Sequence, residues 1–327
     1  MKTLRISRLY SGGIITNYYC SSKCKHCLYG SSPSWEKKYM DEAMAVRILR
    51  KIKALGCHTV HVGGGEPMLN IPCLKKFINT ANSEGIGIEY IETNSSWYKD
   101  EKSCIELLQE LKSIGIHTLL ISISPFHNEY IPFYKVKGVM SACRKAGVSI
   151  FPWVREFAPQ LDALDDQIPH SLEEYKGVFG EDYMLQITSK YNLNYRGRAM
   201  LTYKDIYLHQ RLEHILEKSK GCDELSGVSH FHFDLFGNYV PGLCSGFGIN
   251  VDDLGGDIDC HKYPFINLLY SEGIKGFLKM AQEEYGFEPR ETYLSKCHLC
   301  FDIRSYLVRE KRIDTAELKP TEHYEHI

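Results

Sequence analysis

HTVHVGGGEPMLNIPCLKKFINTANSEGIGIEYIET, residues 58–93, decides the fold of this chain. The segment begins with a short β-rich run at 58–62, which predicts a strand. A helix is predicted next, because Pro72 suits the first helical turn and Gly85 suits the position just past the last one. The run at 86–93 predicts a second strand. A strand, a helix and a strand of these lengths indicate one βαβ unit of a parallel sheet.

The same unit recurs on both sides of this segment. Before it, DEAMAVRILRKIKALG predicts a helix with Asp41 as its N-cap and Gly56 just past its end. After it, EKSCIELLQELKSIG with IHTLLISI, and VMSACRKAG with VSIFPWV, repeat the helix and the strand. IITNYY (14–19) is expected to be the first strand and MLQI (184–187) the sixth. The sequence therefore predicts an α/β fold whose active residues lie at the carboxyl ends of parallel strands.

Composition excludes several classes of protein. The chain has 327 residues, 43% hydrophobic and 24% charged, which is typical of a globular protein with one large domain and an appendage. Its formal net charge of −2 gives no reason to expect nucleic acid or an anionic membrane as a partner. No run approaches about 18 apolar residues, and the N-terminus lacks the apolar core of a secretion signal, so we expect a cytoplasmic protein. Its 12 cysteines are then expected to be metal ligands, catalysts or core residues rather than disulfides.

Three closely spaced cysteines, Cys20, Cys24 and Cys27, lie in NYYCSSKCKHCLYGSSP (18–34), on the loop after the first expected strand. Three interpretations compete. The thiols are part of a zinc site, although structural zinc usually takes four ligands. They are buried structural cysteines, which the polar neighbouring residues disfavour. Or they hold a 4Fe–4S cluster and leave one iron open, which is a catalytic feature. The spacing favours the cluster.

GGGEP (63–67) follows the second expected strand, at the same end of the sheet as the cysteines. CSSKCKHC and GGGEP together resemble the CxxxCxxC and GGEP motifs of the radical S-adenosylmethionine (SAM) enzymes, and the resemblance covers roughly residues 10 to 205. The departure from the family pattern is His26, which stands where an aromatic residue is common. The resemblance implies a partial (β/α)6 barrel of the TIM type. It also implies that Cys20, Cys24 and Cys27 hold a 4Fe–4S cluster whose open iron binds SAM.

The resemblance extends to residues around SAM. The glycines would let backbone groups approach its methionine moiety, and the glutamate would accept from its amino group or fix the loop. Polar residues after the third and fourth strands resemble the family's SAM-facing positions, and either arginine of YRGRAM (195–200) can clamp a carboxylate. Each is otherwise an ordinary turn, cap or surface residue. The expected cofactor-binding residues are Gly63, Gly64, Gly65, Glu66, Pro67, Thr93, Asn94, Ser122, Ser124 and Arg198.

Five more cysteines follow residue 205, and CHLC (297–300) is a strong local metal motif. Together with an expected hairpin at 231–244, they resemble the twitch module, a shortened form of the SPASM auxiliary-cluster domain. The resemblance implies a second, auxiliary 4Fe–4S cluster, and a structural zinc on the same thiolates is the alternative. The expected ligands are Cys222, Cys244, Cys297 and Cys300, and Cys260 is either a spare ligand or a free thiol that returns a hydrogen atom to substrate.

These observations divide the chain into a radical SAM partial barrel (10–205), a small β-hairpin and helix module for the auxiliary cluster (206–311) and a loosely held polar tail (312–327). We expect hydrogen abstraction from a peptide or small metabolite, leading to oxidation, cross-linking or epimerisation. A reducing partner such as flavodoxin or ferredoxin is expected to supply electrons. The alternatives are a small-molecule dehydrogenase of the same family and, from another class, a zinc-stabilised binding protein on an α/β scaffold.

Overall fold

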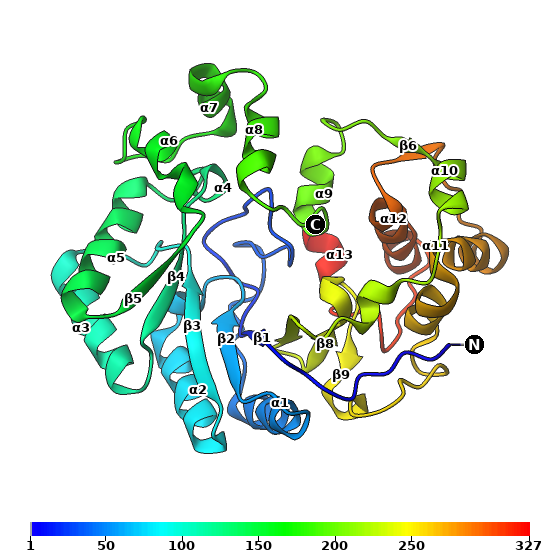
Figure 1. Ribbon diagram of the computed structural model, residues 1–327, viewed down its shortest axis with the longest axis horizontal. Coiled ribbons are helices and arrows are strands. Elements are labelled where there is room, and N and C mark those ends of the chain that lie inside the picture. The colour runs from blue at the N-terminus through cyan, green and yellow to red at the C-terminus, as the bar shows by residue number, and fades with distance from the viewer. Residues whose placement is uncertain (1) are drawn as a thin grey trace.

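The computed structural model describes residues 2–327, and one sheet runs through both halves of the molecule (Figure 1). The strands are β1 (Gly12–Ile15), β2 (Thr59–Gly63), β3 (Gly87–Thr93), β4 (Thr118–Ser122), β5 (Ser149–Trp153), β6 (Gln210–Arg211), β7 (Phe231–Asp234), β8 (Asn238–Val240), β9 (Ile249–Asn250) and β10 (Thr292–Tyr293). The large sheet has the order β5-β4-β3-β2-β1-β7-β8-β9, and a second sheet pairs β10 with β6. Strands β1 to β5 are parallel, as the βαβ repeats predict.

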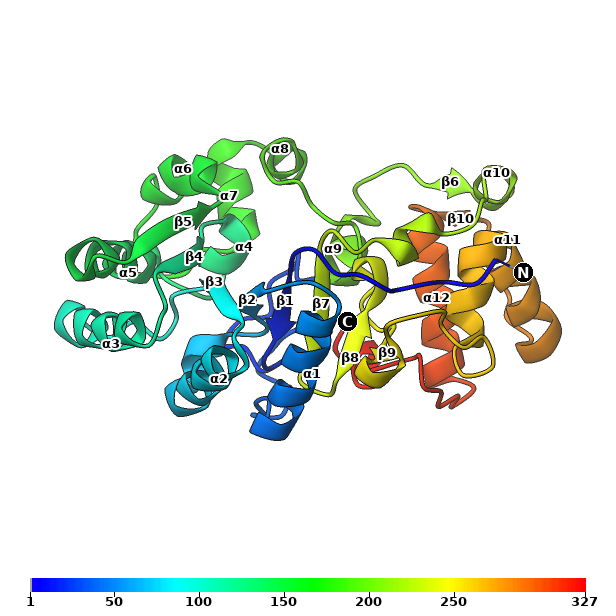
Figure 2. The same ribbon diagram turned by 60° about the horizontal axis from the view of Figure 1, so that its bottom comes forward.

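Helices cover one side of the parallel strands (Figures 1 and 2). The helices are α1 (Glu42–Ala54), α2 (Ile71–Glu84), α3 (Glu101–Ser113), α4 (Pro125–Asn128), α5 (Phe133–Ala146), α6 (Ala158–Asp162), α7 (Leu172–Phe179), α8 (Tyr183–Lys190), α9 (Gly197–Tyr203), α10 (Leu212–Glu217), α11 (Pro264–Tyr285), α12 (Lys296–Arg309) and α13 (His323–His326). Helices α1, α2, α3 and α5 lie outside β1 to β5, while α11 and α12 pack together in the C-terminal half. Of the helices described, none has the length and apolar character needed to cross a membrane.

The helix ends confirm the predicted capping. The Asp41 side chain accepts a hydrogen bond of 2.8 Å from the backbone N–H of Met44, which satisfies a free donor in the first turn of α1. Gly56 follows that helix with φ of 91°. Gly85 ends α2 in the left-handed conformation, with φ of 70°. These residues set the lengths of the βα units and so bring the strand ends to a common edge.

Strand β7 joins the C-terminal half to the barrel, because it pairs in parallel with β1. The register places Gly13 opposite both His61 of β2 and His232 of β7. The expected hairpin at 231–244 is confirmed by the antiparallel pairing of β7 with β8. In residues 2–327 the sheet ends at β5 and β9 without closing, so the barrel is partial and its interior stays open to one side.

Two sequence predictions are wrong. MLQI (184–187) is not a sixth strand, because it lies within α8, where Met184 and Ile187 face the core at helical spacing. The segment 312–327 is not loosely held. Its Tyr324 is fully buried, and the His326 ring stacks on Trp35 with ring centroids 4.2 Å apart. The polar composition of this segment therefore conceals a few side chains that anchor it against the loop after β1.

Candidate active site

The loop after β1 carries the first three cysteines and is closed at its base. Tyr19 pairs with Ser32, and the backbone N–H of Cys20 donates to the Ser32 carbonyl at 3.1 Å. The N–H of Cys27 donates to the Cys24 carbonyl, also at 3.1 Å, which turns the chain back on itself. All three cysteines line one cavity at the carboxyl ends of the parallel strands. Other residues of that cavity include Gly64, Gly65, Pro67, Thr93, Asn94, Ser122 and Arg198.

The glycine segment packs directly against the cysteine loop. The N–H of Gly65 donates to the Asn17 carbonyl at 2.7 Å, and the N–H of Glu66 donates to the Tyr19 carbonyl at 3.1 Å. A Cβ on Gly65 would lie 2.0 Å from the Tyr19 carbonyl oxygen, and Gly64 has φ of 138°. Only glycine allows this approach. In this structure the glycines therefore seat the cysteine loop, a role additional to the predicted contact with SAM.

Glu66 is fully buried, and its carboxylate is occupied by its own chain. It accepts from the N–H of Met68 at 3.1 Å, from the Thr93 hydroxyl at 3.0 Å and from the N–H of Asn94 at 2.6 Å. Burial raises the pKa of Glu66 to about 7, against the opposing effect of these donors. Of the two roles expected for this residue, the structure shows the loop-fixing one.

Asn94 links the end of β3 to the first cysteine. Its side-chain N–H donates to the Sγ of Cys20 at 3.4 Å. Thr93 does not face the cavity with a free hydroxyl, since that oxygen donates to Glu66 and accepts from the indole N–H of Trp97 at 2.8 Å. Hydrogen bonds to sulfur tune the potential of an iron–sulfur cluster, so Asn94 is placed to act on one bound by Cys20.

Arg198 holds the cysteine loop from the other side. Its Nε donates to the Cys24 carbonyl at 2.9 Å, its Nη2 donates to the Ser31 carbonyl, and its backbone N–H donates to the Cys27 carbonyl at 3.0 Å. The guanidinium is thus used to shape the loop while it also lines the cavity. Its role as a clamp for a carboxylate of SAM stays a prediction.

The two serines at and just after the end of β4 lie in different surroundings. Ser122 lines the cavity, whereas Ser124 is fully buried outside its wall and shares a hydrogen bond of 2.7 Å with Nδ1 of His127. His26, the departure from the family pattern, stacks on Phe126 with ring centroids 4.7 Å apart. An imidazole therefore does the packing that an aromatic residue performs at this position, which explains why the substitution fits.

The three thiols fit an iron–sulfur cluster better than a single metal ion. Tetrahedral zinc with Zn–S bonds of about 2.3 Å brings its sulfurs within roughly 3.8 Å of one another. Among residues 2–327, no three cysteines bring their sulfurs within 4.8 Å of one another. Burial raises the pKa of Cys20 to about 12 and that of Cys24 well above its usual value, so positive charge is needed to hold them as thiolates. A cluster is larger than one ion and supplies that charge.

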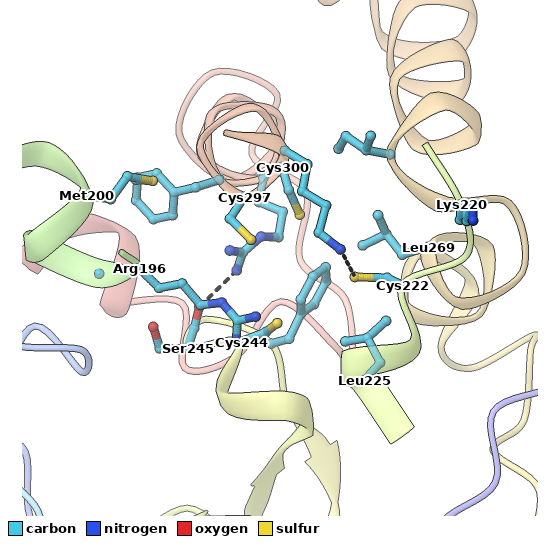
Figure 3. Close-up of a pocket in the computed structure, with 16 residues that line it drawn as sticks. Arg196, Met200, Lys220, Cys222, Leu225, Cys244, Ser245, Leu269, Cys297 and Cys300 are labelled. Carbon is cyan, nitrogen blue, oxygen red and sulfur yellow. Dashed lines mark hydrogen bonds between the residues drawn. The ribbon is translucent and has the colours of Figure 1, made fainter. Parts of the chain in front are cut away.

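The four C-terminal cysteines meet at a second cavity (Figure 3). Cys222 reaches it because α11 is broken at Gly273, which has φ of 71°, and the N–H of Cys222 donates to the freed Leu269 carbonyl at 2.9 Å. Cys244 follows a tight turn in which Gly242 has φ of 55°. Cys297 and Cys300 come from the first turn of α12. Chain segments that are far apart in sequence thus present four thiols to one space.

Three cations, of which Arg304 is buried, lie around this second cavity. Arg196 and Lys296 line it, and the Lys296 ammonium lies 3.8 Å from the Sγ of Cys222. Arg304 is buried beside Cys300, and its guanidinium donates to the Ser245 carbonyl at 2.9 Å. Positive groups of this kind offset the negative charge of a cluster with four thiolate ligands. The residue set therefore fits an auxiliary cluster, and the thiol spacing again does not match a single zinc ion.

Cys260 has no place in either site. It is exposed, and the residues around both cavities do not include it. Its predicted role as a hydrogen donor requires a position beside the substrate, which the structure does not give it.

Sequence reasoning missed the inner wall of the first cavity. The missed residues of this wall include Glu92 of β3 and Phe151 and Trp153 of β5. The sequence carried a signal for these residues, because alternate residues of each predicted strand face the same side of the sheet. The wall of the first cavity also includes His230 and His232.

The sequence comparisons agree with the motif. Residues 14–151 match the model of the Radical SAM superfamily, so this part of the chain is a domain of that superfamily. Its members use a 4Fe–4S cluster and SAM, so the chain is an enzyme of this type. The match ends before the four C-terminal cysteines. A search of curated proteins finds no match.

Three solved structures illustrate the likeness in fold. Native anSMEcpe with bound AdoMet is 14% identical, with a TM-score of 0.43, covering 92% of this chain and 98% of that one. BtrN in complex with AdoMet and 2-DOIA is 16% identical, with a TM-score of 0.40, covering 84% and 88%. HydG, a maturase of the FeFe-hydrogenase, is 17% identical, with a TM-score of 0.33. The match covers 43% of this chain and 33% of the HydG chain. These likenesses identify no substrate for this chain.

Proposed function

We propose that this radical SAM enzyme uses two 4Fe–4S clusters to modify a peptide or small metabolite by hydrogen abstraction. Cys20, Cys24 and Cys27 hold the cluster that binds SAM. The auxiliary cluster is held by Cys222, Cys244, Cys297 and Cys300. The observation that carries the proposal is the start of α9, where Arg196 lines the four-cysteine cavity while Arg198 lines the three-cysteine cavity. The two sites are therefore joined by three consecutive residues.

The reduced cluster, when bound, supplies one electron to the sulfonium of SAM, which splits into methionine and a 5′-deoxyadenosyl radical. The chain's residues do the remaining work. Arg198, Glu66 and the glycines fix the cysteine loop, so that one coordination position is left without a protein ligand. Tyr90, Phe151 and other aromatic side chains wall the cavity and limit the access of water to a reactive species.

An auxiliary cluster fully ligated by the chain cannot bind substrate, and it can accept an electron. A substrate radical formed in the first cavity would then give one electron to a cluster held by the four C-terminal cysteines. Loss of a proton would complete a double bond, and attack by a nucleophilic group of the substrate, with loss of its proton, would complete a cross-link. Epimerisation requires a hydrogen donor instead. Ser245, beside Cys244 at the cavity, cannot donate a hydrogen atom as a thiol does, and Cys260 lies elsewhere. This arrangement favours oxidation or cross-linking. A flavodoxin or ferredoxin is the proposed reductant.

The test is the metal content of anaerobically purified and reconstituted protein, followed by dithionite and SAM. We expect about eight irons per chain, two clusters of four, and formation of 5′-deoxyadenosine. About four irons, continued cleavage and a zinc ion with sulfur ligands by X-ray absorption would keep the radical mechanism and assign zinc to the C-terminal cysteines. A colourless protein with zinc and no cleavage would overturn the proposal in favour of a zinc-stabilised binding protein.

A further inference from the structure

Three histidines meet inside the barrel, below the cysteine loop. They are His61 of β2, His232 of β7 and His230 just before β7. One ring nitrogen of each lies within 4.8 Å of the corresponding nitrogens of the other two. His61 and His232 are 1% and 8% exposed, while His230 is open to the cavity. Buried histidines gathered in this way need an explanation from either packing or chemistry.

Hydrogen bonding accounts for little of the arrangement. The Nε2 atoms of His61 and His232 lie 3.0 Å apart, which is compatible with a single shared proton. The Nδ1 atoms of both rings are buried and have no hydrogen-bond partner in the part of the chain that is described. The cluster is therefore not a satisfied polar network of the kind that stabilises a core.

A carboxylate lies next to His61. Glu92 of β3 places its Oε1 3.7 Å from the Nε2 of His61. Its side chain is 39% exposed, and that exposure is to the cavity, whose wall it forms. Across residues 2–327, the Glu92 carboxylate is seen to make no hydrogen bond of normal geometry, so its charge is not used by another side chain.

Strand β1 leaves room for this group. Gly13 lies opposite His61 in the sheet register, and a Cβ there would stand 2.1 Å from the imidazole Nε2. The Tyr90 ring stacks on His61, with centroids 4.9 Å apart and planes 7° from parallel. Gly13 thus leaves space for the Nε2 edge of the His61 ring, and Tyr90 packs against its face.

We propose that His61, His230 and His232 bind a first-row divalent metal ion such as Zn²⁺ or Fe²⁺ inside the barrel, beside the carboxylate of Glu92. Imidazole is a ligand that these ions favour, and three protein ligands leave the fourth position of a tetrahedral ion open. Two nitrogens on a tetrahedral ion at about 2.05 Å stand about 3.4 Å apart, so the observed 3.0 Å needs only a small opening. The site shares the cavity of the three cysteines, and an open coordination position would face substrate there.

The test is zinc binding by the reconstituted holoenzyme, in which the thiols are already occupied by iron. Zn²⁺ is titrated against a chromophoric chelator, and the ligand atoms are identified by X-ray absorption at the zinc edge. We expect one zinc per chain that is lost in His230→Gln and His232→Asn. Binding should weaken at least about tenfold in each variant, because removing a ligand costs no less than removing a residue that orients one. His261→Gln, at an exposed position, is the matched control and should bind as the wild type does.

His230 is open to the cavity, so its variant is expected to fold, and an unchanged iron content verifies this. Zinc with only nitrogen and oxygen ligands in the wild type supports the proposal. Zinc on sulfur, equal binding by the histidine variants, or no zinc at all would overturn it and leave a hydrogen-bonded histidine pair. Zinc binding does not depend on SAM cleavage, so a protein that binds zinc here but forms no 5′-deoxyadenosine would contradict only the proposed function.

Discussion

The two cysteine sites are built in opposite ways. Cys20, Cys24 and Cys27 belong to a single loop, whereas the four C-terminal thiols come from a loop, a turn and a helix (Figure 3). The three-cysteine site opens into the cavity that the strand ends form, and the four-cysteine site is surrounded by packed side chains and cations. An open position serves catalysis, and complete protein ligation serves electron transfer. The difference teaches that ligand number and access, rather than cysteine content, separate the two roles.

The largest expected effect is at the open site. Cys24→Ala should remove about four irons and abolish 5′-deoxyadenosine formation, because two thiolates cannot replace three for this cluster. The measurement is iron and sulfide analysis together with chromatography of the nucleoside products. Cys73→Ala, on α2 outside both cavities, is the control and should keep both properties. If Cys24→Ala still forms 5′-deoxyadenosine, the three-cysteine site is not the site of SAM cleavage.

At the closed site, Cys297→Ala should remove a similar amount of iron while SAM cleavage continues. The reason is that Cys297 lines only the second cavity and the cysteine loop has its own anchors. Iron analysis and 5′-deoxyadenosine formation without substrate measure the two outcomes separately. Loss of both clusters together would show that the sites are one folding unit rather than two.

Arg198→Met should destabilise the protein by about 3–5 kcal/mol, since it leaves the buried carbonyls of Cys24 and Ser31 without donors. Arg198→Lys should recover part of this loss by keeping one charged donor. Denaturant unfolding of the protein without clusters is the measurement. Equal stability of the Met variant and the wild type would mean that the arginine serves a ligand rather than the loop.

A smaller effect is expected at Tyr324. Its hydroxyl accepts from Arg304 at 3.0 Å and donates to the Gly246 carbonyl at 2.7 Å, next to the four-cysteine cavity. Tyr324→Phe should cost about 1–2 kcal/mol in the free energy of unfolding. Tyr10→Phe, at a residue 60% exposed, should change it little. An unchanged free energy of unfolding in Tyr324→Phe would show that the C-terminal segment does not stabilise the four-cysteine site.

The same contrast explains what the sequence could predict. The βα units, the Asp41 cap and the cysteine loop depend on residues close together in the chain, and local pattern was enough. The parallel pairing of β1 with β7 joins residues more than two hundred positions apart, and local pattern carries no signal for it. MLQI (184–187) shows the limit of sequence-based prediction for short apolar runs, because periodicity does not distinguish a strand from a helix in a run of this length.

The candidate sites follow the same division. The motif located the three open-site cysteines, and the family match supports their role in SAM chemistry. It did not reveal that Arg198 donates its guanidinium N–H groups to carbonyls of the cysteine loop, because those contacts depend on tertiary packing. The histidine group was hidden for the same reason. His61 and His232 become neighbours only when β2 and β7 flank β1.

The central claim, one open and one closed cluster, is tested most directly by electron paramagnetic resonance of the dithionite-reduced protein with and without SAM. We expect two cluster signals, of which one changes when SAM is added and the other does not. In Cys297→Ala the unchanged signal should disappear and the SAM-sensitive one should remain. If both signals respond to SAM, or if neither does, the assignment of one open and one closed cluster is wrong.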